Sequence, residues 1–113
     1  MSKNAGEDAR RAVYHDVVSW VAEKTRRKPE DIDVSKKFSD PPYRITKGGF
    51  DRMCKDICSS LSTSTGREIS LPKDWVIQHR QDQIGVFITN VAIELLAAPM
   101  NSLGRASLRW VIG

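Results

Sequence analysis

The stretch DARRAVYHDVVSWVAEKTR, residues 8–26, decides the fold class of this chain. Its apolar side chains recur every three or four residues, at Ala9, Val13, Val17, Trp20 and Val21. That spacing puts them on one face of an α-helix. Basic residues at the end of the stretch suit the negative end of the helix dipole, and a proline follows at position 29. The pattern predicts a long amphipathic helix that ends before this proline.

Two later segments carry the same pattern. Residues 46–61 have a stripe formed by Phe50, Met53, Ile57 and Leu61, and the polar run Ser-Thr-Ser-Thr-Gly that follows predicts the end of that helix. Residues 81–97 have another stripe, and a short helix containing Trp75 is expected after a proline at position 72. No segment shows the alternation of a β-strand. The sequence therefore predicts an all-α fold, a small antiparallel bundle of three long helices plus one short helix.

The first connection, residues 29–45, is long for a bundle of this size. Its apolar residues Ile32, Val34 and Phe38 are spaced among charged ones, which predicts an ordered loop anchored to the helices. We expect residues 1–98 to form the helical bundle. Residues 99–113 differ in character, being basic and apolar together, and are expected to form a separate C-terminal tail.

Composition excludes several classes of protein. The chain has 113 residues, the length of one ordinary domain, and a formal net charge of +4 that is spread along it. This mild charge does not favour a dedicated nucleic-acid binder. No apolar run approaches the roughly 20 residues of a membrane span, and the polar N-terminus lacks the apolar stretch of a secretory signal. Two cysteines are too few for a disulfide scaffold, so a reducing, cytoplasmic setting without a membrane is expected.

The order of helix, long loop, helix, short helix and helix resembles the acyl carrier protein fold. Val21 closes the first predicted helix, Ile32 follows eleven residues later, and Phe38 follows six residues after that. In the family, apolar residues at these places pin the long loop to the bundle. The run Gly66-Arg-Glu-Ile69 looks like the family's segment that leaves the second helix. The resemblance covers about residues 10–97 and implies a carrier-like bundle.

The sequence departs from the family where a carrier bears its prosthetic group. Acyl carrier proteins have Asp-Ser-Leu at the start of the second helix, and the serine carries phosphopantetheine. The matching position is Thr46, within Ile45-Thr46-Lys47, and all three identities differ. A structural role for Thr46 as a helix N-cap is favoured over a role as the phosphopantetheine site. The family's second helix is also acidic, whereas this one carries Lys47, Arg52 and Lys55 against Asp51 and Asp56 and is therefore not acidic.

Other candidate sites have less support. Cys54 and Cys58 lie four residues apart and could form a zinc set with His15 and His79, but the histidines show no paired spacing. Buried small residues beside the apolar stripe are the favoured interpretation, and no metal is expected. No phosphate-binding glycine loop or catalytic triad order is present, so we expect no catalytic residues and no enzyme.

Two basic segments leave further alternatives open. The run Thr25-Arg26-Arg27-Lys28, joined by residues 47–55, would suit a small helical DNA- or RNA-binding protein, although a solvated helix end is favoured. The tail contains Leu108, Trp110 and Ile112, which are costly to leave in water. Docking of the tail onto the bundle and binding of the tail to a partner are equally supported.

The leading hypothesis is a non-catalytic, acyl-carrier-like domain that acts as a protein-interaction module and holds no cofactor. Its expected partner-binding residues lie on the second helix and the tail: Lys47, Arg52, Lys55, Leu108, Trp110 and Ile112. The first alternative is a divergent working carrier with phosphopantetheine on Thr46. The second alternative is the small nucleic-acid-binding protein. The identity of the partner and the oligomeric state are not encoded in any motif.

Overall fold

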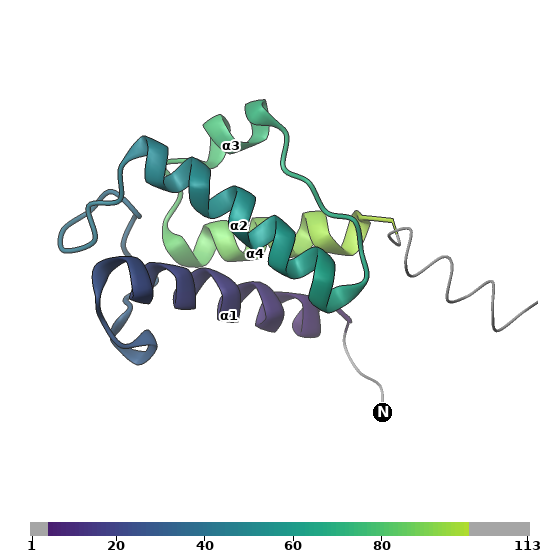
Figure 1. Cartoon of the computed structure of the whole chain (residues 1–113), viewed down its shortest axis with the longest axis horizontal. Helices are drawn as coiled ribbons and strands as arrows, with labels where there is room; N and C mark the ends of the chain where they lie inside the picture. The colour runs from purple at the N-terminus through teal and green to yellow at the C-terminus, as the bar shows by residue number, and fades with distance from the viewer. Residues whose placement is uncertain (1–4, 100–113) are drawn as a thin grey trace, which may run out of the picture.

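A computed structural model describes residues 5–99 of the chain. These residues form four α-helices in the order α1 (Ala5–Thr25), α2 (Lys47–Thr65), α3 (Lys73–His79) and α4 (Ile84–Ala97), with a 3-10 turn at Pro29–Asp31 (Figure 1). Within the described range there is no β-strand, and an isolated β-bridge joins Lys37 and Gln83. The predicted all-α fold, three long helices and a short one, is confirmed. The predicted tail begins at residue 99, and residues 100–113 lie outside the described part of the chain.

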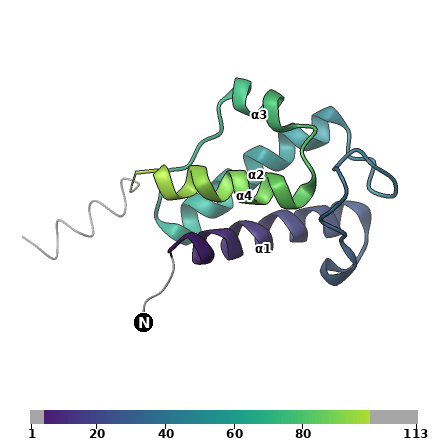
Figure 2. The ribbon, with the colours of Figure 1, turned by 180° about the vertical axis from the view of Figure 1, so that it is seen from behind.

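The three long helices lie alongside one another, and the short one stands apart. Helix α1 packs against both α2 and α4. Figures 1 and 2 show that α1 runs opposite to α2 and α4, which run in the same direction as each other. The chain achieves this by crossing back through α3, which sits on the far side of α2 and α4 from α1. The bundle is therefore antiparallel between α1 and its neighbours only.

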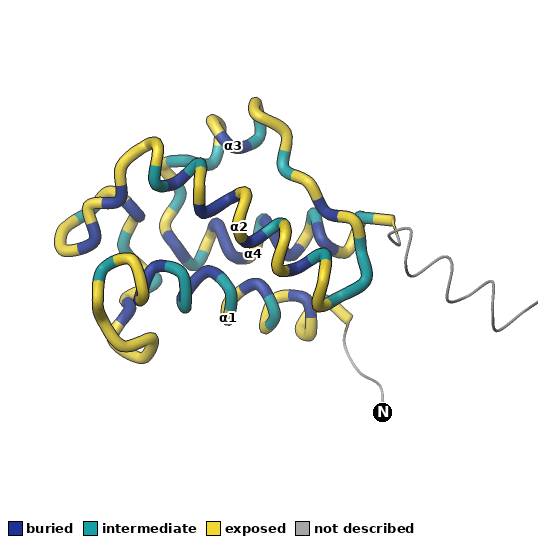
Figure 3. The backbone as a smooth tube through the Cα atoms, viewed as in Figure 1, coloured by how far each residue is buried: buried dark blue, intermediate teal, exposed yellow. Residues whose placement is uncertain are grey.

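Helix α1 buries the stripe that its sequence predicts. Val13, Val17 and Val21 are fully inaccessible, and Ala9 is buried at the first turns. The burial pattern in Figure 3 follows one face of each long helix, so the core lies where the three helices meet. Trp20 is only partly buried, and its indole Nε1 donates a hydrogen bond of 2.9 Å to Oδ2 of Asp56 on α2.

Three phenylalanine rings join the long loop to two helices. Phe38 in the loop, Phe50 on α2 and Phe87 on α4 contact one another edge to face, with centroids 5.2–5.3 Å apart. Each ring is at most 1% exposed. Edge-to-face packing of aromatic rings is favourable beyond the area it buries. The predicted anchoring of the loop through Ile32 and Phe38 is thus confirmed by their burial.

The same loop supplies the cap of α4. Gln83, the N-cap residue, makes no side-chain capping bond. Instead the backbone N–H groups of Ile84 and Gly85 donate to the carbonyl oxygens of Lys36 and Val34, each at 2.8 Å. These are donors that a helix start leaves without partners in its own backbone. The loop therefore fixes where α4 begins, three residues later than the predicted start at residue 81.

Helix α2 is longer than its sequence predicts. The polar run after Leu61 remains helical through Thr65, and the helix ends at Gly66, whose φ of 73° is the left-handed conformation of a glycine C-cap. Thr65 Oγ1 donates to the carbonyl of Leu61 at 2.6 Å. Such hydroxyl bonds to the preceding turn let the low-propensity Ser and Thr residues extend the helix. The predicted end near Leu61 was wrong for this reason.

The segment after α2 is tied to the end of α4. Arg67 Nη1 donates to the carbonyl oxygens of Leu96 and Ala98, at 3.1 and 3.0 Å, and the N–H of Glu68 donates to the carbonyl of Pro99 at 2.7 Å. A cationic side chain that donates to the last carbonyl groups of a helix satisfies acceptors that have no partner within the helix.

No helix within residues 5–99 is long and apolar enough to cross a membrane.

Candidate functional site: the α2–α3 groove

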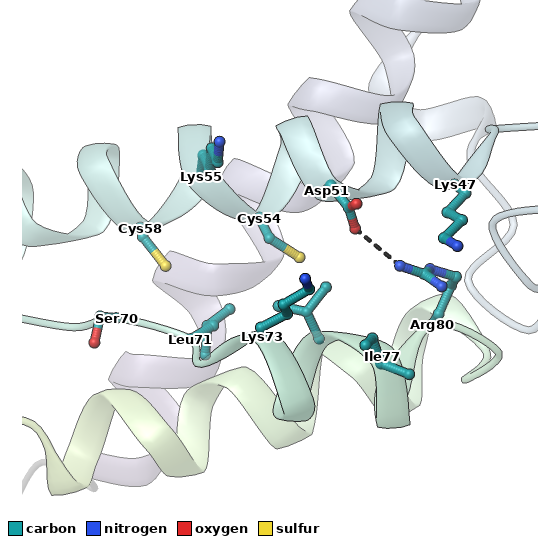
Figure 4. Close-up of a pocket in the computed structure, with 11 residues that line it drawn as sticks. Lys47, Asp51, Cys54, Lys55, Cys58, Ser70, Leu71, Lys73, Ile77 and Arg80 are labelled. Atoms are coloured by element: carbon teal, nitrogen blue, oxygen red, sulfur yellow. Dashed lines mark hydrogen bonds and ion pairs between the residues drawn. The ribbon is translucent and has the colours of Figure 1, made fainter.

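A hollow on the described surface lies between α2 and α3. It has a volume of about 800 Å³ and is open to solvent. Figure 4 shows the side chains that line it. We call it the α2–α3 groove. It is lined by residues of α2, of the segment that follows α2, and of α3 with its C-cap: Lys47, Asp51, Cys54, Lys55, Cys58, Ser70, Leu71, Lys73, Val76, Ile77 and Arg80.

Each wall of the groove is one stripe of a helix. On α2 the lining positions are 47, 51, 54, 55 and 58, and on α3 they are 73, 76, 77 and 80. Positions three, four and seven residues apart share a helix face. Both helices therefore present a coherent face to the groove, and the adjacent face of α2, with Phe50, Met53 and Ile57, is buried in the core.

Helix α3 is held in place by its contacts with α4. Val76 is buried, and the ring of Trp75 meets the ring of Phe87 with centroids 5.8 Å apart. The Trp75 ring also lies 4.1 Å from the ring of His79, whose Nδ1 is 2.7 Å from Oδ2 of Asp82. Asn90 on α4 donates to the same carboxylate at 3.2 Å. These contacts fix the wall of the groove opposite α2.

One ion pair crosses the groove. Arg80 Nη2 donates to Oδ1 of Asp51 at 3.1 Å, and the Arg80 side chain is only 18% exposed (Figure 4). The bond therefore links α3 directly to α2 at the end of the groove that is nearer Lys47. A further nitrogen of this side chain, Nε, is buried and has no hydrogen-bond partner.

The groove carries an excess of positive charge. Its lining includes four cationic side chains and the one carboxylate of Asp51, which is already paired with Arg80. The other three cations, Lys47, Lys55 and Lys73, are exposed and form no ion pair with another described residue. Lys47 and Lys55 come from the α2 wall and Lys73 from the α3 wall. The field over the groove is therefore positive on both sides.

Apolar groups form the rest of the lining. Val76 is buried, Leu71 is half-buried, and Ile77 is 50% exposed. The two thiols complete this surface. Burial raises the pKa of the Cys54 thiol to about 12, and it also raises the pKa of Cys58. Both cysteines are thus neutral near pH 7 and behave as small apolar groups rather than as nucleophiles.

The structure brings some of the predicted partner-binding residues together and separates others. Lys47 and Lys55 both line the groove. Arg52 is exposed on α2 and does not line it. Leu108, Trp110 and Ile112 lie outside the described residues. The basic run at the end of α1 does not line the groove either, and its Arg27 instead lies over the ring of Tyr43 at 5.9 Å.

Thr46 is the N-cap of α2, as predicted. Its Oγ1 accepts a hydrogen bond of 3.1 Å from the N–H of Gly49, and the residue is exposed. The preceding residue, Ile45, is 5% exposed and belongs to the core, so this position anchors the loop. The following residue, Lys47, opens the wall of the groove.

The four residues considered as a zinc set do not lie together. Within residues 5–99 no group of three or more histidine, cysteine or carboxylate side chains is placed to hold a metal ion. Cys54 is buried in the groove wall, whereas His79 pairs with Asp82 and His15 lies on α1 beside Asp16 at 3.3 Å. No histidine lines the groove, so its hydroxyl and thiol groups have no neighbouring imidazole base there.

Sequence reasoning missed the α3 wall. Lys73, Ile77 and Arg80 were not singled out, although positions 73, 76, 77 and 80 repeat at helical spacing. Ile77, within the predicted short helix, was the available signal, because an exposed apolar side chain can belong to an interaction surface.

Comparison with protein-family models, with curated proteins and with solved structures gives no match to this chain.

Proposed function

We propose that this chain is a non-catalytic protein-interaction module, built on a bundle that resembles an acyl carrier protein, and that it binds its partner through the α2–α3 groove. The observation that supports this most is the set of three unpaired lysines around an apolar lining. An apolar centre with a polar, solvent-accessible rim is the usual composition of a protein–protein interface. In this proposal Lys73 and Ile77 join Lys47 and Lys55 in the contact, and Arg52 lies outside the groove.

The surroundings of Thr46 do not fit a phosphopantetheine site. The acidic residue that precedes the family's serine is replaced by the core residue Ile45, and the leucine that follows it is replaced by Lys47. The hydroxyl accepts the N–H of Gly49, so its capping role accounts for the threonine without any modification. The γ-methyl group of threonine also adds bulk that a transferase pocket for serine has to accept. These features support loss of the carrier chemistry.

One feature keeps a divergent carrier as the second candidate. Thr46 is exposed at the start of α2, which is where a transferase would have to reach it. The intact mass of the purified chain, after incubation with coenzyme A and a broad-specificity phosphopantetheinyl transferase, decides between the two. We expect no mass gain. A gain that disappears in Thr46→Ala would establish the carrier and remove the claim that the arm has been lost.

The interaction function is tested by photo-crosslinking in extracts of the source cells. The full chain would carry a photoreactive group at exposed Ser70, which lines the groove. We expect one or a few proteins to crosslink to the wild type and to be lost with Lys47→Glu combined with Lys55→Glu. The matched control, Arg52→Glu combined with Lys28→Glu, changes the same number of exposed charges outside the groove and should retain them.

Two results would count against this function. Equal loss of the crosslinked proteins in both double variants would show a general charge effect and not a specific surface. Crosslinks to nucleic acid that fall steeply with salt, and are lost with Arg26→Ala and Arg27→Ala, would favour the small nucleic-acid-binding protein instead.

A further inference from the structure

We propose that the α2–α3 groove binds an acidic amphipathic α-helix of the partner, with apolar side chains inserted against Ile77 and acidic side chains paired with the lysines on both walls. This inference rests on the proposed interaction function and specifies the chemistry of the partner. The partner helix has to match the groove in length, in apolar surface and in charge.

The dimensions of the groove suit a short helix. From Lys47 to Cys58 the α2 wall covers eleven residue steps, which at 1.5 Å each is about 16 Å. A partner helix of about three turns would span that length. A volume of about 800 Å³ lies within the usual range for binding sites that enclose several side chains. Because the groove is open to solvent, its lining is accessible to a helix of the partner.

The apolar part of the groove supplies the anchor. Ile77 is half exposed, and Leu71, Cys54 and Cys58 belong to the same lining. Neutral thiols and aliphatic side chains gain from contact with another apolar surface. Helix-in-groove recognition places such contacts at partner positions separated by three, four and seven residues. The facing stripes on α2 and α3 accommodate this periodicity.

The charges specify the polar flanks of the partner. Lys47 and Lys55 on one wall and Lys73 on the other have no ion pair with a described residue, and Asp51 is already held by Arg80. Asp or Glu residues on both sides of an apolar stripe would therefore meet cations on both sides. The chain's own tail carries arginines at positions 105 and 109 and no acidic residue, so its charge does not suit the groove. A nucleic-acid strand would pair with the lysines but has no aliphatic stripe for Ile77.

The probe is a displayed library of 14-residue, alanine-based helical peptides, varied on one face and on its two flanks, with the full chain as bait. We expect enriched peptides to carry large apolar residues at i, i+3 or i+4, and i+7, flanked by Asp or Glu. Fluorescence anisotropy of a labelled, enriched peptide should then show at least tenfold weaker binding to Ile77→Ser and to Lys55→Gln. The matched controls are Ile93→Ser on α4, where the side chain is 57% exposed, and Arg52→Gln on α2. Neither lines the groove, and both should bind as the wild type does.

The inference would be overturned by any of three results. These are a library that yields no enriched peptide, an enriched peptide whose affinity is unchanged by Ile77→Ser, and a variant peptide with serine at all apolar positions that binds as tightly as its parent. The last result would mean that the groove recognises negative charge alone, as it would in a nucleic-acid binder. Far-ultraviolet circular dichroism of each variant excludes unfolding as the cause of weaker binding. If crosslinking to a partner depends on Lys47 and Lys55 while the peptide tests fail, the interaction function stands and only its helical, acidic ligand is wrong.

Discussion

Arg80 at the end of α3 and Asp51 on α2 form the hydrogen-bonded ion pair that spans the α2–α3 groove, with Nη2 and Oδ1 3.1 Å apart. The arginine is mostly buried, whereas the carboxylate is about half exposed. The pair therefore holds the two walls at one end of the groove and leaves Lys47, Lys55 and Lys73 without an internal acidic partner. The ion pair therefore affects both the stability of the bundle and the net positive charge of the groove lining.

The ion pair should contribute modestly to stability. In a double-mutant cycle of Asp51→Asn and Arg80→Gln, we expect a coupling of about 0.5–1 kcal/mol, because one partner is half exposed and solvent screens the charge. Urea unfolding of the four proteins measures it. A coupling indistinguishable from zero at low salt would contradict a stabilising role for this ion pair.

The N-cap of α2 should be worth more than its exposed position suggests. Thr46→Ala removes the oxygen that accepts from Gly49 N–H, and we expect the free energy of unfolding to fall by about 1 kcal/mol. Thr46→Ser keeps a hydroxyl in the same place and should lose little. Equal losses in both variants, measured by urea unfolding, would mean that the methyl group and not the cap stabilises this turn.

The aromatic cluster should be the most sensitive part of the core. Phe38→Ala would leave a cavity between the loop, α2 and α4, and we expect a loss of about 3–5 kcal/mol. Tyr14→Ala, which truncates an aromatic side chain that is 39% exposed, is the control and should cost far less. Thermal unfolding followed by circular dichroism compares them. A loss below about 1 kcal/mol for Phe38→Ala would contradict its role as the anchor of the loop.

The buried thiol predicts a defined pH dependence. The pKa of Cys54 is raised by burial from 9.0 to about 12, so the folded state disfavours the thiolate that the unfolded state forms above pH 9. Its contribution to stability is complete below pH 9 and is lost as the pH rises toward 12. Lysines and tyrosines also titrate in this range, so the relevant quantity is the difference between the wild type and Cys54→Ala. We expect the wild type's relative stability to decline from pH 9 to pH 11, and a difference that stays constant would contradict the raised pKa.

The same shift predicts slow alkylation of Cys54. A thiol reacts as its thiolate, which is a very small fraction of Cys54 at pH 8. Peptide mapping after brief iodoacetamide treatment of the folded chain should find Cys54 modified far more slowly than in the urea-unfolded chain. Equal rates in the two states would show that the thiol is neither buried nor shifted.

The helices were predictable because their signals are local. Apolar periodicity gave α1, α2 and α4, the proline at position 72 marked the start of α3, and Thr46 is the N-cap that its residue type indicates. The errors lie at boundaries set by more distant atoms. The start of α4 depends on carbonyl groups of Lys36 and Val34, nearly fifty residues earlier in the chain. The end of α2 depends on a glycine C-cap that overrides the low propensity of the residues before it.

The same distinction between local and distant contacts applies to the candidate site. The sequence by itself determined that α2 carries Lys47 and Lys55 and that its apolar stripe is buried, because both follow from side chains at helical spacing on one element. Only the tertiary structure decided that α3 faces α2, that Lys73 and Ile77 join those lysines around one groove, and that Arg80 neutralises Asp51. Those relationships depend on Trp75, Val76 and His79 packing against Phe87 and Asn90 of α4. Side chains far apart in the sequence meet only when such packing fixes the angle of a short helix, and no local pattern encodes that angle.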